Sequence, residues 1–126
     1  MHAILAVALG GALGSVMRYL VVSRVAHWLG APFPWGTFTV NVLGCFVFGA
    51  LAEIFARKWS PGGEVQLLLT TGFLGGFTTF SAFSFDTYML YERGAMLAAG
   101  GYVLGSVVLS ILAFFAGLHL LRLIPA

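Results

Sequence analysis

Four apolar stretches of membrane-spanning length fill most of this 126-residue chain and leave little room for other architectures. They cover residues 4–22, 35–55, 65–91 and 96–121. A helix needs about 20 apolar residues to cross a bilayer. Hydrophobic residues make up 60% of the chain and charged residues only 8%, against roughly 25% in a soluble domain. The sequence therefore predicts an all-α integral membrane protein, with a single four-helix transmembrane domain over residues 1–126.

The third stretch contains a run that a lipid-facing helix does not normally carry. Residues 72–84 read GFLGGFTTFSAFS, with glycines, hydroxyls and phenylalanines in place of Leu, Ile and Val. Glycine weakens a helix, and Thr78 and Thr79 can bond nearby backbone groups. We therefore expect the third helix to be broken at mid-membrane, over residues 72–79, where freed carbonyl oxygens suit a hard cation. The alternative is an intact helix whose glycines form a packing groove.

Basic residues are divided almost evenly between the two ends of the four spans. Arg57, Lys58 and Arg122 fall on one side, and Arg24 and Arg93 fall on the other. Three charges against two give almost no positive-inside bias. A chain without this bias can insert in both orientations, and inverted copies can then pair about a two-fold axis in the membrane. The alternative is that the Arg57–Lys58 pair fixes a single orientation.

Small residues recur at intervals of four, as they do where helix backbones pack closely in lipid. The glycine and serine pairs of this kind are Gly10 and Gly14, Gly72 and Gly76, Gly101 and Gly105, and Ser106 and Ser110. We expect tight helix packing at most of them.

Several side chains at membrane depth are candidates for lining an ion path. Phe80 and Phe83 share a helical face, and the positive edge of an aromatic ring can approach an anion. Ser81 and Ser84 form a neighbouring pair of hydroxyl donors. Asn41, in the middle of the second span, either donates to a permeating anion or hydrogen-bonds across the bundle.

Other polar residues allow more than one interpretation. Arg18 either attracts anions or extends its guanidinium to the interface. Asp86 can relay protons, end a helix or pair with Arg18. Ser106 and Ser110 share a face of the last span and extend a polar track, unless their own helix backbone takes the hydroxyls. Cys45, the only cysteine, is expected to pack as a small apolar residue.

Three motifs resemble those of the Fluc (CrcB-type) fluoride channel family. Residues 10–19 (GGALGSVMRY) look like the family's first-helix motif, and residues 35–44 (WGTFTVNVLG) resemble its second-helix signature. Residues 72–84 are similar to its third-helix motif, GFxGGxTTFSTFS. The likeness covers nearly the whole chain. Two departures are Ala82, where threonine is common, and Asp86, where glutamate is common.

The resemblance implies a passive fluoride channel with no enzymatic activity, in the bacterial cytoplasmic (inner) membrane. It implies an antiparallel, dual-topology homodimer with two pores, exporting fluoride down its electrochemical gradient and reducing fluoride toxicity. A structural Na⁺, not transported, would lie at the dimer centre on the backbone carbonyls of Gly75 and Thr78. The pore residues that the resemblance and the spacing together predict are Arg18, Asn41, Phe80, Ser81, Phe83, Ser84 and Ser106. Partners are fluoride, a second copy and the bilayer.

The leading alternative is a small dual-topology, proton-coupled exporter similar to the small multidrug-resistance class. Such exporters use a membrane-embedded acid in the first helix, and the first span here has none. Asp86 would then carry the coupling. A third hypothesis, a purely structural membrane subunit, predicts no ion flux. The net charge of +2, without any basic run, does not indicate nucleic-acid binding.

Overall fold

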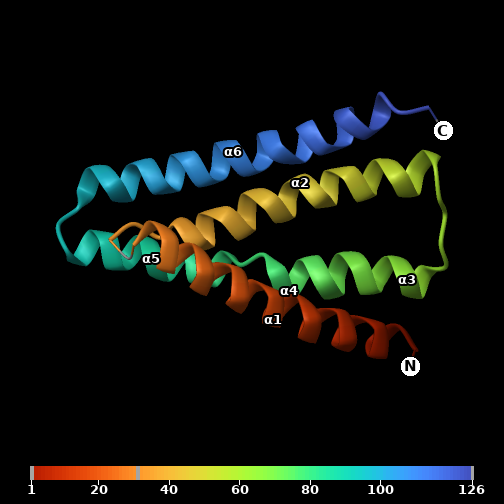
Figure 1. The fold of residues 1–126 in the computed structure, drawn as a ribbon, viewed down its shortest axis with the longest axis horizontal. Helices are drawn as coiled ribbons and strands as arrows, with labels where there is room; N and C mark the ends of the chain where they lie inside the picture. The colour runs from red at the N-terminus through yellow and green to blue at the C-terminus, as the bar shows by residue number, and fades with distance from the viewer. Residues whose placement is uncertain (1, 31, 126) are drawn as a thin grey trace.

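The computed structural model describes residues 2–30 and 32–125 and forms a bundle of helical spans (Figure 1). Three of the spans are single helices: α1 (His2–Leu29), α2 (Trp35–Arg57) and α6 (Met96–Arg122). The third span is a series of shorter elements: α3 (Gly63–Leu67), the π-helical η1 (Leu68–Leu74), α4 (Gly75–Phe77) and α5 (Phe80–Glu92). Four helical segments of the described chain are long and apolar enough to cross a membrane. The prediction of an all-helical fold with four spans is confirmed.

The first helix is longer than the sequence predicted. It was expected to end near residue 22, but α1 continues to Leu29. Gly30 ends it, with a φ of +88° that a side chain would disfavour, and its N–H bonds the carbonyl of Ala26 at 2.9 Å. The apolar pattern fades after residue 22, but helix geometry persists until a residue that permits the left-handed turn.

Glycines of α1 bring that helix into backbone contact with the third span. A β-carbon at Gly10 would collide with the carbonyl oxygen of Leu68, and one at Gly14 with that of Phe73. Only glycine fits at such an approach. The expected tight packing is therefore confirmed at Gly10 and Gly14, and it holds α1 against η1.

A second glycine contact, between α2 and α6, was not predicted. A β-carbon at Gly49 would collide with the carbonyl oxygen of Phe114, and one at Gly117 with that of Phe46. Gly49 and Gly117 lie in different helices and far apart in sequence, so no spacing pattern links them and the sequence gives no signal for the pair. The predicted packing glycines of α6 behave differently, since β-carbons at Gly101 and Gly105 would meet no atom within 4 Å in the described chain.

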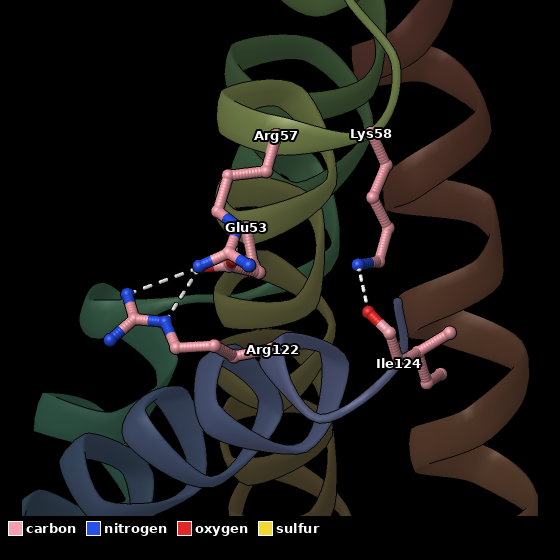
Figure 2. A network of polar contacts seen from close by, with 5 residues as sticks. All are labelled: Glu53, Arg57, Lys58, Arg122 and Ile124. Atoms are coloured by element: carbon pink, nitrogen blue, oxygen red, sulfur yellow. Dashed lines mark hydrogen bonds and ion pairs between the residues drawn. The ribbon is translucent and has the colours of Figure 1, made fainter. Parts of the chain in front are cut away.

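Both chain termini lie at the same end of the bundle, where α2 also ends (Figure 1). Glu53 is buried there, at 2% exposure, and accepts ion pairs from two arginines. Arg57 Nε lies 2.9 Å from Glu53 Oε2, and Arg122 Nη2 lies 3.1 Å from Oε1. Lys58 Nζ donates to the carbonyl of Ile124, as Figure 2 shows. The end of α6 is thus tied by charge to the end of α2.

We expect Glu53→Gln to lower the free energy of unfolding by about 2 kcal/mol, because hydrogen bonds to charged groups contribute about 1.5–3 kcal/mol. The amide keeps the shape of the side chain but loses the charge that both arginines approach. The measurement is the thermal unfolding midpoint of the purified protein in detergent. Glu64→Gln, which alters an exposed carboxylate in α3, serves as the control. Equal midpoints for the two variants would show that the cluster does not stabilise the fold.

Candidate functional site

The third span loses its helical backbone at only two residues. Thr78 has φ −88° and ψ 159°, and Thr79 has φ −154° and ψ 125°, so both are extended. The predicted interruption over residues 72–79 is therefore correct for the two threonines and wrong for residues 72–77. Those residues stay helical, with 72–74 at the end of the π-helical η1 and 75–77 in α4, because close backbone contacts of Gly72 and Gly76 with α1 support the coil. The packing groove and the break, which the sequence offered as alternatives, both occur. The glycines pack on α1, and the break follows at the two threonines.

Asn41 on α2 holds the extended backbone in place. Its side-chain Nδ2 donates to the carbonyl of Thr79 at 3.0 Å, and its Oδ1 accepts the N–H of Thr79 at 2.8 Å. Both backbone groups of one residue are thus satisfied by a single amide, as a neighbouring β-strand would do. Of the two open interpretations for Asn41, hydrogen bonding across the bundle is confirmed. One Nδ2 hydrogen is left over from these contacts, because a primary amide carries two.

The same contacts remove the helical donors of two carbonyl groups. In a continuous helix the Thr79 N–H would bond to Gly75 and the Ala82 N–H to Thr78. Here the Thr79 N–H goes to Asn41, and the Ala82 N–H goes to the Thr79 hydroxyl oxygen at 3.1 Å, which caps α5. Gly75 and Thr78 are the residues whose carbonyls were predicted to hold a cation. Within the described part of the chain, these two oxygens therefore lack the N–H donors that a continuous helix would supply.

Arg18 on α1 contacts the other side of the break. Its Nε donates to the carbonyl of Gly76 at 2.9 Å, where the Phe80 N–H would bond in a continuous helix. The guanidinium is therefore turned toward the third span at the level of the break. It neither reaches an end of α1 nor pairs with Asp86 among the described residues.

A cavity of about 290 Å³ lies directly beside the break, between α2, α5 and α6. Its walls carry no charged side chain among the described residues and consist of Asn41, Cys45, Thr78, Thr79, Phe80, Phe83, Ser106, Val107, Ser110 and Ile111. Four of the predicted pore residues line it together. Two polar lining residues, Cys45 and Thr79, were not assigned to the pore from sequence; the position of Cys45, one helical turn after Asn41, was the available signal.

Two phenylalanines of α5 line this cavity. The ring centroids of Phe80 and Phe83 lie 5.4 Å apart, with the ring planes at 53°. Phe83 is 7% exposed and packs on Tyr102, whereas Phe80 is 76% exposed in the single chain. The pair thus joins a buried ring to one at the surface of the single chain.

The four serines predicted as hydroxyl donors divide into two pairs. Ser84 donates to the carbonyl of Phe80 at 3.0 Å, and Ser81 lies 3.3 Å from the Thr79 hydroxyl on an exposed part of α5. Ser106 and Ser110 line the cavity, and neither hydroxyl has a hydrogen-bond partner in the described part of the chain. The serines of α6 are therefore the available donors, while Ser81 and Ser84 lie outside the cavity.

Asp86 lies apart from this cavity. Its Oδ2 accepts a hydrogen bond from the Tyr102 hydroxyl at 3.2 Å. It lines a separate hollow with Pro32, Pro34 and Arg93, between the turn that precedes α2 and the end of α5. The carboxylate is thus held at a different level from the helix break.

Comparison with known proteins gives a consistent result. The profile of the family described as "CrcB-like protein, Camphor Resistance (CrcB)" matches residues 5–118. A protein of Rhizobium etli named "Fluoride-specific ion channel FluC" is 56% identical over 118 residues, which is 94% of each chain. Proteins with the same name from Chelativorans sp. and Rhodospirillum centenum are 56% and 53% identical, and the alignments cover at least 97% of each chain. Because the family profile matches most of the chain and these relatives align with nearly its whole length, the chain belongs to the CrcB/FluC family.

Proposed function

We propose that this chain is a fluoride-specific ion channel of the bacterial cytoplasmic membrane. The observation that carries the proposal is the uncharged cavity at the helix break, lined by a phenylalanine pair, the Asn41 amide and the free hydroxyl of Ser106. Fluoride is small and strongly hydrated, so a path for it has to replace water with close donors and still release the ion. Ring edges, an amide and hydroxyls can do so without a fixed cation that would trap it. The relatives named "Fluoride-specific ion channel FluC" also support fluoride as the transported ion.

Export needs no chemical step in this scheme. Fluoride crosses membranes as the neutral weak acid and dissociates in the more alkaline cytoplasm. An inside-negative potential drives an anion outward with about 2.3 kcal/mol per 100 mV. A passive and selective path is therefore sufficient to lower cytoplasmic fluoride, and the protein acts as a channel and not as an enzyme.

We expect Phe80→Ile and Asn41→Asp each to reduce fluoride efflux from proteoliposomes by at least about tenfold, which corresponds to about 1.4 kcal/mol. The first removes a ring edge, and the second puts a negative charge beside the proposed path and removes the donor to the Thr79 carbonyl. Efflux is measured with a fluoride electrode, and the elution volume of each variant checks its fold. Phe85→Ile, which alters an exposed ring of α5 outside the cavity, is the matched control.

The same assay separates the channel from the proton-coupled exporter. An exporter that depends on Asp86 would lose transport in Asp86→Asn and would respond to a pH gradient. The channel predicts efflux without any pH gradient. Full efflux in both Phe80→Ile and Asn41→Asp would remove those residues from the path, and no efflux from the unchanged protein would contradict the channel itself.

The channel we propose is an antiparallel, dual-topology homodimer. Three observations support a second copy packed against exposed parts of this chain. Phe80 is 76% exposed although it lines the cavity, Gly75 at the break is exposed, and β-carbons at Gly101 and Gly105 would meet nothing within 4 Å. The weak charge bias between the two ends supports inverted insertion.

A protease site added after Ala126 tests the orientation. In right-side-out spheroplasts we expect about half of the chains to be cut from outside, because dual insertion puts equal numbers of C-termini on each side. Permeabilised cells, in which every chain is accessible, provide the control. Cleavage of all chains or of none from outside would contradict dual topology.

A structural Na⁺ at the dimer centre belongs to the same proposal. The residues fit such an ion, since the carbonyls of Gly75 and Thr78 have lost their helical donors and a hard cation prefers oxygen ligands. Two inverted copies would supply these oxygens twice. Bound there, the cation would neutralise carbonyl dipoles and bind the two breaks to each other, without being transported.

We expect replacement of Na⁺ by K⁺, at constant ionic strength throughout purification, to lower the thermal stability of the dimer. An ion present at about 100 times its Kd contributes about 2.7 kcal/mol to stability. The measurement is the unfolding midpoint from tryptophan fluorescence, followed over a Na⁺ titration. The same midpoint at every Na⁺ concentration would contradict a specific sodium site.

A further inference from the structure

The cavity continues along the α2–α6 interface beyond the phenylalanine pair. Asn41 and Cys45 lie one turn apart on α2, and Ser106 and Ser110 lie one turn apart on α6. All four line the same cavity. The four-residue spacing in each pair corresponds to about 6 Å along a helix. The lining therefore extends from the helix break toward the chain termini, with one α2 side chain and one α6 side chain at each level.

The hydroxyls on this wall differ from others in the bundle. Four hydroxyls in helical parts of the described chain donate to the carbonyl four residues earlier; they belong to Thr39, Thr70, Ser84 and Thr87. Ser106 and Ser110 also lie within a helix, but neither makes this bond. Ser106 is only 4% exposed. A buried hydroxyl without a partner is unfavourable unless a polar species occupies the space beside it.

Cys45 occupies the α2 side of the deeper level. It is partly buried, and its thiol lies beside the Ser110 hydroxyl. The sequence predicted simple packing for this residue, but its neighbours on the cavity wall are polar and available. We propose that Cys45 lines the fluoride path below Asn41, and that its thiol is a modification site where a small adduct closes the channel. This inference rests on the proposed function.

The chemistry of the thiol makes the proposal testable. Thiolate, and not thiol, is the nucleophile, and an apolar environment suppresses its formation. A cysteine facing lipid or dry core therefore reacts slowly, whereas one on a wet path reacts readily. With methyl methanethiosulfonate, the Cys45 thiolate attacks the sulfenyl sulfur and forms a methyl disulfide. The S–SO₂ bond breaks, methanesulfinate leaves with the electron pair, and the thiol proton goes to water.

The unchanged protein is already a single-cysteine chain, so the experiment needs no cysteine-free background. Proteoliposomes are treated with the reagent, intact mass gives the fraction modified, and a fluoride electrode gives the efflux. We expect one adduct per chain and a fall in efflux of at least tenfold. Dithiothreitol should restore both the mass and the rate, since the added group is held by a disulfide.

Two variants serve as controls, each compared with its own untreated rate. Cys45→Ser should be unaffected by the reagent. Cys45→Ser combined with Val47→Cys moves the thiol about 200° around α2, to an exposed position outside the cavity. Its efflux should not change on treatment, even when the adduct is complete.

Each contrary outcome has a definite meaning. Efflux that survives complete modification of Cys45 would overturn the inference and leave the channel proposal intact. Modification of denatured but not of native protein would overturn it as well, because the thiol would not lie on a wet path. An unchanged protein that shows no fluoride efflux before treatment would instead overturn the proposed function.

Discussion

The reciprocal hydrogen bonds between Asn41 and Thr79 are the contact on which the candidate site depends. An unpaired peptide group is costly in a bilayer, so a helix can be interrupted there only if other groups satisfy its backbone. The Asn41 amide satisfies both polar groups of Thr79 at once. Because it takes the Thr79 N–H, it also frees the Gly75 carbonyl, so one side chain both permits the break and exposes a potential cation ligand.

The break is supported from two sides by elements far apart in sequence. Arg18 of α1 binds the Gly76 carbonyl, and Asn41 of α2 binds Thr79. Glycine contacts fix both neighbours, with α1 held against η1 and α2 held against α6. The extended residues are therefore positioned by rigid helices, and this rigidity is what an ion path needs if its donors are to replace water at a set distance.

Much of the site followed from local patterns. Hydropathy gave the four spans, and the polar, glycine-rich run gave a break in the third span, because lipid tolerates few exceptions to an apolar helix. The three-residue spacing of Phe80 and Phe83 put both rings at one cavity. The position of the break was predicted too broadly, since glycine can serve either unwinding or close packing, and Gly72 and Gly76 do the latter.

The sequence alone determined that the chain crosses the membrane four times, and its motifs pointed to the residues at the break, because apolar length and residue type are local properties. Only the tertiary structure decided which hydroxyls are free. Ser84 and Ser106 look alike in sequence, yet one bonds its own helix and the other faces a cavity. The tertiary structure also decided that Cys45 lines the cavity beside the α6 serines. Its position there depends on the rotation of α2 against α6, whose backbones meet at Gly49 and Gly117.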